Sequence, residues 1–124
     1  MDKYKDESAI LNENNNLMNI KSNFDYAIMD AELEDEEEAA LSIYESELVI
    51  FDDFIFNHEN ELSNNPHFKS FLRSYNSKVF VKNEGSEESE GSYYTDPFSV
   101  EVHRFMSEYI QNLIDKNEKL LEKK

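Results

Sequence analysis

The sequence offers few places where the chain can turn sharply. It has only two glycines, Gly85 and Gly91, and two prolines, Pro66 and Pro97, among 124 residues. Because glycine and proline interrupt regular helices, their scarcity favours long helices over a turn-rich β fold. Hydrophobic residues make up 39% of the chain, including nine Phe and seven Tyr, which is enough for one core. We therefore predict a single, mainly helical domain.

Apolar residues recur at intervals of three and four along four segments, which predicts four helices. The predicted helices cover residues 15–31, 35–62, 66–76 and 97–122. Residues 1–13 are polar and are predicted to be a flexible N-terminus, so the acidic helical domain spans 14–124. The predicted fold class is all-α, an irregular four-helix bundle with a flexible acidic loop near 84–96. A short strand or hairpin near 79–81, giving a small α+β fold, is the alternative.

Local signals place the starts of these helices. Asn14 to Asn16 offer N-caps for the first, and Asp35 with Glu38 resembles a capping box for the second. Pro66 and Pro97 suit the first position of a helix, and Asp96 is the predicted N-cap of the fourth. The β-prone runs 48–51 and 54–56 leave a strand or a break within the second helix open.

The apolar stripes of the predicted helices define a core. The predicted core residues are Phe24, Ile28, Leu41, Tyr44, Leu48, Phe51, Ile55, Phe68, Phe71, Leu72, Phe105, Tyr109 and Leu113.

Negative charge is the main clue to function. The net charge is −16, and the tail from Lys116 to Lys124 is itself +2, which leaves −18 on residues 1–115. Seven of the nine residues from Asp30 to Glu38 are acidic. Like charges weaken a helix interior but suit a first turn, so this run predicts the start of the second helix. The electrostatic field of this negative charge repels nucleic acid and anionic membranes and attracts basic surfaces.

The composition contains no recognisable catalytic motif. Cysteine is absent, which excludes disulfides and a thiol nucleophile. His58-Glu59 begins like a zinc-protease motif, but Leu62 stands where the second His is required. The acidic run lacks the glycine of a calcium loop. We predict no enzyme, no cofactor and no metal, although paired carboxylates among the 28 acids stay open. Without a signal peptide or a spanning apolar run, the predicted location is the cytoplasm or nucleus, the host cytoplasm if the protein is viral.

A rigid acidic helix can occupy a groove that normally binds the phosphates of nucleic acid, because such grooves recognise negative charge through Lys and Arg. On the predicted second helix, Glu38, Glu45, Asp52 and Glu59 repeat every seven residues. The predicted partner-binding residues are Glu34, Asp35, Glu37, Glu38, Glu45, Asp52, Asp53, Glu59, Glu87, Glu88, Tyr93 and Tyr94.

In charge, length and predicted helicity the chain resembles phage-encoded DNA-mimic inhibitors, such as anti-restriction and anti-CRISPR proteins. The resemblance extends to no motif. It implies an inhibitor that binds a basic, nucleic-acid-binding protein, with no direct contact to nucleic acid or membrane. Two alternatives stay open: a structural or adaptor subunit of a larger intracellular complex, and an immunity or antitoxin protein for a basic nuclease.

Overall fold

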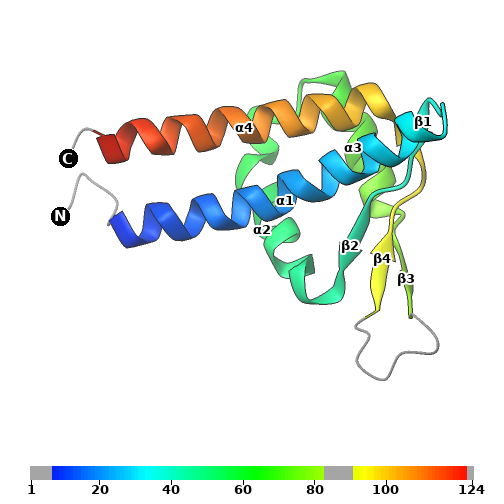
Figure 1. Ribbon diagram of the computed structural model, residues 1–124, viewed down its shortest axis with the longest axis horizontal. Helices are drawn as coiled ribbons and strands as arrows, with labels where there is room; N and C mark the ends of the chain where they lie inside the picture. Colours follow the sequence, from blue (N-terminus) through cyan, green and yellow to red (C-terminus); the bar gives the residue numbers. More distant parts are fainter. Residues whose placement is uncertain (1–6, 83–90, 123–124) are drawn as a thin grey trace.

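The computed structural model describes residues 7–82 and 91–122, of which 73% are helical (Figure 1). The helices of this part are α1 (Glu7–Leu33), α2 (Leu48–Leu62), α3 (Pro66–Asn76) and α4 (Val100–Glu122), with a short 3-10 helix at Glu45–Glu47. The strands are β1 (Glu38–Ala39), β2 (Ser42–Tyr44), β3 (Val79–Val81), β4 (Ser92–Tyr94) and β5 (Phe98–Ser99).

The long helices α1 and α4 lie side by side in opposite directions and form the frame of the molecule (Figure 1). Helices α2 and α3 pack against this pair. The core between them is rich in aromatic rings: Phe24 of α1 is fully buried, and its ring centroid lies 6.3 Å from that of Phe51 and 5.5 Å from that of Phe71. Burial of each such ring contributes roughly 1.5–3 kcal/mol, so the frame depends on these contacts.

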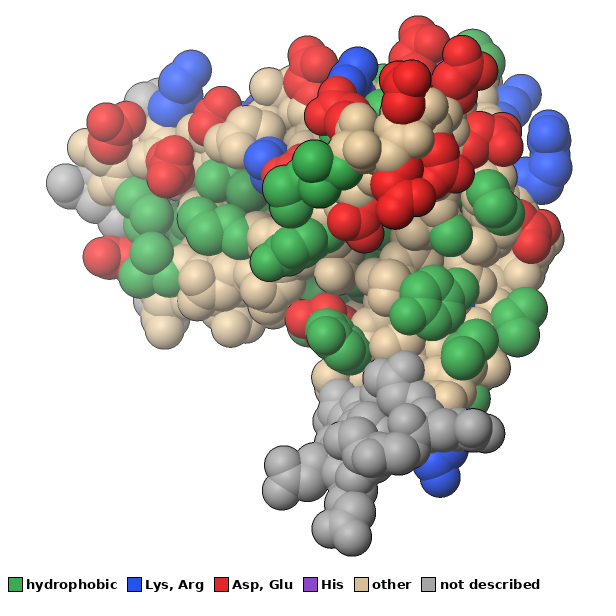
Figure 2. Space-filling view, turned by 45° about the vertical axis from the view of Figure 1, so that its right-hand side comes forward, with side chains coloured by type: hydrophobic (Ala, Val, Ile, Leu, Met, Phe, Trp, Pro, Cys, Tyr) green, Lys and Arg blue, Asp and Glu red, His purple; other side chains and the backbone are tan. Residues whose placement is uncertain are grey.

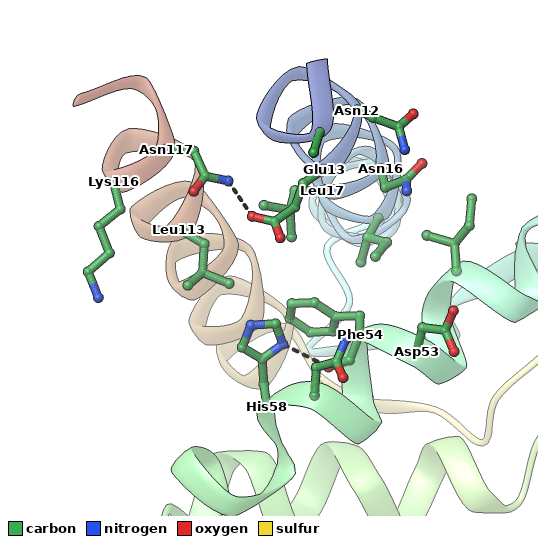
Figure 3. Close-up of a pocket in the computed structure, with 14 residues that line it drawn as sticks. Asn12, Glu13, Asn16, Leu17, Asp53, Phe54, His58, Leu113, Lys116 and Asn117 are labelled. Atoms are coloured by element: carbon green, nitrogen blue, oxygen red, sulfur yellow. Dashed lines mark hydrogen bonds between the residues drawn. The ribbon is translucent and has the colours of Figure 1, made fainter. Parts of the chain in front are cut away.

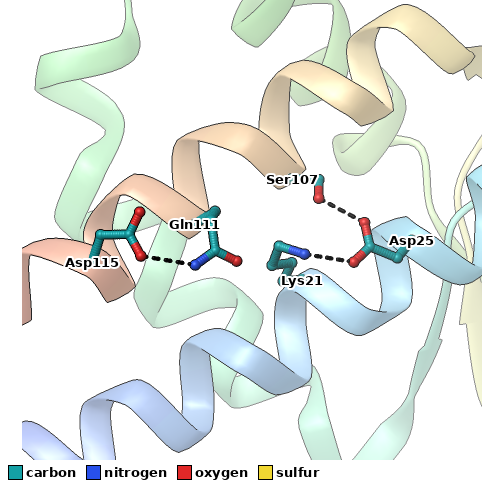
Figure 4. Close-up of polar contacts among 5 residues, drawn as sticks. All are labelled: Lys21, Asp25, Ser107, Gln111 and Asp115. Atoms are coloured by element: carbon teal, nitrogen blue, oxygen red, sulfur yellow. Dashed lines mark hydrogen bonds and ion pairs between the residues drawn. The ribbon is translucent and has the colours of Figure 1, made fainter. Parts of the chain in front are cut away.

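Polar contacts align α1 with α4 (Figure 4). The Asp25 carboxylate accepts hydrogen bonds from Lys21 Nζ at 2.8 Å and from Ser107 Oγ of α4 at 2.6 Å. Nearer the chain termini, Asn117 Nδ2 of α4 donates to Asn14 Oδ1 at 2.9 Å, and both amides are buried. Buried amides need a matched partner, so this pair favours one alignment of the two helices.

The predicted flexible N-terminus of residues 1–13 is wrong from Glu7 onward, because α1 begins there and Ile10 is buried. Asn14 is the buried partner of Asn117 and does not cap a helix. The tertiary contact with α4 outweighs the weak helix propensity of the Asn run. Residues 1–6 lie outside the described part of the chain.

The prediction of an all-α fold is also wrong. The described residues contain two small antiparallel sheets, one pairing β1 with β5 and one in the order β2-β4-β3. The protein is therefore a mostly helical α+β fold. The alternative strand near 79–81 is confirmed as β3, and the predicted helix at 66–76 is confirmed as α3, with Asn65 Oδ1 accepting a hydrogen bond from His67 N.

The predicted helix over 35–62 is wrong in its first half, since α2 begins only at Leu48. The residues before it form β1, β2 and the 3-10 helix, and Ile43 in the middle of β2 is fully buried. Its strand partner β4 lies far along the chain, which local periodicity could not reveal. The β-prone runs 48–51 and 54–56 are both helical.

The segments 37–45 and 91–100 form one antiparallel ribbon. Glu38 pairs with Ser99 at one end, and Tyr44 pairs with Ser92 near the other. Between the two sheets the register shifts by one residue, as at a β-bulge. There the buried Thr95 makes two bonds to Leu41: its Oγ1 accepts from Leu41 N at 3.0 Å, and its N–H donates to Leu41 O at 3.1 Å.

This ribbon also changes the start of the fourth helix. Asp96 and Pro97 precede β5 and do not open a helix, so the predicted start at 97 is wrong. The Ser99 Oγ accepts a hydrogen bond from Val102 N at 3.1 Å and caps α4 in place of Asp96.

Most of the predicted core is confirmed. Phe24, Leu41, Phe51, Ile55, Phe68 and Phe71 are buried, and Leu48, Leu72, Phe105, Tyr109 and Leu113 pack partly buried against them. Ile28 is only half-buried. The prediction that Tyr44 belongs to the core is wrong, because its side chain is 54% exposed. Tyr44 lies on a strand, where neighbouring side chains point to opposite faces, and its neighbour Ile43 is the buried one.

Thr95→Val tests the ribbon. The variant keeps the shape of the side chain but leaves the buried Leu41 N–H without an acceptor, so we expect a loss of about 2 kcal/mol in the free energy of unfolding. Thr95→Ser, which keeps the hydroxyl, should lose less. Urea denaturation measures both, and equal losses in the two variants would contradict the role of this hydrogen bond.

His103 adds a pH dependence to stability. Its ring is fully buried and stacks on Phe98 with centroids 3.9 Å apart, and its Nδ1 donates to the Ser99 carbonyl at 2.9 Å. Burial lowers the pKa of His103 below its ordinary value of 6.5, because the charged ring cannot be solvated there. The unfolded chain therefore takes up this proton first as pH falls.

We expect the free energy of unfolding to fall below pH 6.5, by about 1.4 kcal/mol per pH unit until the folded protein also binds the proton. Above pH 6.5 this contribution is fully present. His103→Phe removes the titrating group and keeps an aromatic ring, so the difference between the two proteins should change with pH. Urea denaturation across the acidic range would contradict this if the difference stayed constant.

Candidate partner-binding site

The acidic run lies at the end of α1, in the turn that follows and in β1, where acidic side chains gather on the surface (Figure 2). All seven of its carboxylates are on exposed residues. Asp35, two residues past the end of α1, has a positive φ of 57°, and Glu36 N donates to Ala31 O at 2.7 Å. This is a Schellman C-cap, a position that usually prefers glycine. The predicted capping box of Asp35 and Glu38 at a helix start is therefore wrong.

This placement is electrostatically unfavourable. The C-terminus of a helix carries partial negative charge, so carboxylates there are repelled by the helix as well as by one another. Among the described residues, Glu32 alone from the run pairs with a Lys or Arg, namely Arg104. The acidic end of the molecule, which is formed by residues Asp30 to Glu38, therefore lowers the stability of the folded protein. Most of its carboxylates have no Lys or Arg partner among the described residues.

A surface hollow of about 590 Å³ lies between the end of α1 and β1. Four carboxylates line it, those of Asp30, Glu34, Glu36 and Glu38, together with alanines and Pro97 but without Lys or Arg. Within the described part of the chain, no three His, Asp or Glu side chains stand close enough to hold a metal ion. Carboxylates spread in this way suit several basic groups of a partner surface.

An apolar sheet face lies next to this acidic end (Figure 2). The register places Tyr44 of β2, Tyr94 of β4, and Val79 and Val81 of β3 on one face of the three-stranded sheet, and all four side chains are exposed. On the other face, Tyr93 is half-buried and its ring centroid lies 5.0 Å from that of Phe80. Of the two predicted hot-spot tyrosines, Tyr94 is thus on the open face and Tyr93 is not.

The predicted acidic residues do not form one helical stripe. Glu34, Asp35, Glu37 and Glu38 lie together at the acidic end, whereas Glu45 begins the 3-10 helix. The backbone from Glu38 to Glu45 passes through two strands and is not helical, so the spacing of about 10 Å expected for seven helical residues does not apply.

The remaining predicted residues belong to other surfaces. Asp52 and Glu59 lie on α2, where Asp52 accepts a short hydrogen bond from the Tyr75 hydroxyl. Burial, together with this carboxylate, raises the pKa of Tyr75. Asp52 therefore has a structural contact. Asp53 lines a separate pocket, and Glu87 and Glu88 lie outside the described residues.

That pocket lies between α1, α2 and α4 and has a volume of about 490 Å³ (Figure 3). His58 Nδ1 donates to the Phe54 carbonyl at 2.8 Å, and Asn117 Nδ2 donates to Glu13 at 2.5 Å. Its lining supplies side-chain amides, the carboxylates of Glu13 and Asp53, the imidazole of His58 and the amine of Lys116. The pocket can therefore bind a polar group. Sequence reasoning missed it, because its walls come from distant segments.

Comparison of the chain with protein-family models, with curated proteins and with solved structures finds no match. The described helices include none with the length and apolar character needed to cross a membrane.

Neutralising the acidic end should stabilise the protein. We expect Glu34→Gln/Glu36→Gln to raise the free energy of unfolding by about 1 kcal/mol at low salt, with a smaller gain at high salt because salt screens the repulsion. The matched control is Glu101→Gln in the first turn of α4, where a carboxylate suits the helix dipole and its loss should not stabilise. Thermal or urea denaturation that found the double variant less stable would contradict the assignment of strain to this end.

Proposed function

We propose that this chain is a binding protein, not an enzyme, and that its acidic end occupies the basic nucleic-acid-binding surface of a target protein. The observation that carries the proposal is the acidic run from Asp30 to Glu38, held at the negative end of α1 with a basic partner at Glu32 alone among the described residues. The bound state would relieve this repulsion, because Lys and Arg of the target would replace water around the carboxylates.

The surroundings of the acidic end support a specific contact. A typical interface has an apolar centre and a polar rim. Here the exposed Tyr44 and Tyr94 with the valines of β3 supply apolar area, and the neighbouring carboxylates supply charge. Tyrosines are frequent hot spots in such interfaces. The long-range field of a chain with net charge −16 would also speed association with a basic target. The proposal also places this chain and its target in the cytoplasm.

A second candidate is an adaptor subunit of a larger complex, which the exposed apolar sheet face favours. Such a subunit would bind through its apolar surface, and its complex would persist at high salt. It would also leave the nucleic-acid binding of its partner unchanged. These two differences separate it from the first proposal.

The test compares two variants of equal net charge. Glu34→Gln/Glu36→Gln/Glu37→Gln/Glu38→Gln neutralises the acidic end, and Glu59→Gln/Glu108→Gln/Glu118→Gln/Glu122→Gln neutralises four exposed carboxylates elsewhere. Each protein is added to the partner captured by the wild-type chain from the cells that make it, in the presence of labelled duplex DNA or RNA.

We expect the wild-type chain and the second variant to displace nucleic acid from the partner, and the first variant to need at least about tenfold more protein. Displacement should weaken as salt rises. A captured partner without affinity for nucleic acid, or equal displacement by both variants, would overturn the proposal.

A further inference from the structure

Helix α1 carries an uncharged apolar stripe on the side that faces away from the core. Its hydrophobic members are between 46% and 79% exposed, and they are Leu11, Met18, Tyr26, Met29 and Leu33. The exposed Asn15 and Ser22 fill the gaps, so the spacing runs four, three, four, four, three, four. At about 100° per residue, all seven positions fall within one narrow face that runs for roughly 33 Å.

None of these seven side chains belongs to the core of the described residues. The opposite face of α1, which includes Leu17, Ile20 and Phe24, already packs into the core. A surface helix normally presents polar residues to solvent, whereas a helix that is apolar on both sides is usually covered on both. Spacings of three and four are those by which one helix packs along another.

A groove of about 570 Å³ adjoins the stripe between α1 and β2. Tyr26 and Tyr44 line it, both more than half exposed, together with Ala27, Ala40 and the carboxylate of Asp30. Aromatic faces beside a carboxylate favour the cation of an Arg or Lys side chain, whose aliphatic stem can lie along the rings. No Lys or Arg of the described residues lines this groove.

We infer that the outer face of α1 docks a basic amphipathic helix of the target, with one Arg or Lys of that helix in the groove between Tyr26 and Tyr44. The inference rests on the proposed function and names the element of the target that is bound. The straight uncharged stripe matches the apolar side of a helix, and the carboxylate of Asp30, which lines the adjoining groove, matches a basic flank.

A second copy of the chain does not fit this face. Each copy carries a net charge of −16, and pairing two α1 helices would bring the two negative fields together. The acidic residues that flank the stripe toward its C-terminal end therefore select a partner of opposite charge.

The test uses a labelled synthetic peptide that forms an amphipathic helix of leucine and arginine, and a scrambled peptide of the same composition. Met29→Gln/Leu33→Gln removes part of the stripe without changing charge. Val49→Gln/Phe56→Gln on α2 is the matched control, because Val49 and Phe56 are 67% and 79% exposed. Fluorescence anisotropy gives the affinities. Since the chain has no cysteine, a label at Ser22→Cys reports on the stripe, and one at Ser63→Cys reports on the end of α2.

We expect the amphipathic peptide to bind more tightly than the scrambled one, to lose about tenfold affinity with the stripe variant and to be unaffected by the control variant. It should quench the label at position 22 and not that at 63. Equal binding by both variants, or sedimentation showing that the chain pairs with itself through the stripe, would overturn the inference.

The same peptide separates this inference from the proposed function. If neutralising Glu34 to Glu38 weakens binding but the stripe variant does not, charge alone recruits the target, and only the docking inference fails. If the stripe variant weakens binding but neutralisation does not, the electrostatic basis of the proposed function fails.

Discussion

The antiparallel ribbon between 37–45 and 91–100 determines where the charge of this protein lies. In this ribbon the backbone after α1 is extended and pairs with the segment that leads into α4. At its centre, Thr95 and Leu41 are joined by two hydrogen bonds. Because the ribbon requires extended backbone from Glu38 onward, the acidic run cannot serve as the first turn of a helix. It becomes the last turn of α1 and the segment after it, where the helix dipole opposes it.

Because the carboxylates at the end of α1 repel one another, contacts in other parts of the fold must stabilise the protein. The aromatic core around Phe24 and the aligned pair of α1 and α4 supply these contacts, with the Asn14–Asn117 and Asp25–Ser107 contacts holding the two helices in register. Proteins commonly break local rules at the sites where they work. The acidic end, the apolar sheet face and the outer face of α1 are three departures from such rules, which supports the proposal that they contact a partner. The groove lined by Tyr26 and Tyr44 lies between α1 and β2.

The sequence was sufficient for features that depend on neighbouring residues. The Asn65-Pro66 pair predicted the start of α3. Apolar periodicity predicted a helix over 35–62, of which the part from Leu48 onward is α2, and it identified most of the core. It failed where distant segments meet. Ile43 is buried only because β4 pairs with β2, and α1 begins at Glu7 because α4 packs against its first turns. The acidic residues of the candidate site were visible as a run, but their unfavourable position followed from the ribbon alone.

Zero-length cross-linking tests the central claim most directly, because a carbodiimide joins a carboxylate only to an amine that it touches. The complex of the chain with its captured partner is cross-linked, digested and analysed by mass spectrometry. The claim predicts links from lysines of the partner to the carboxylates between Asp30 and Glu38, and few from Glu59, Glu108 or Glu118. Links concentrated on those three residues, with none in the acidic run, would contradict it.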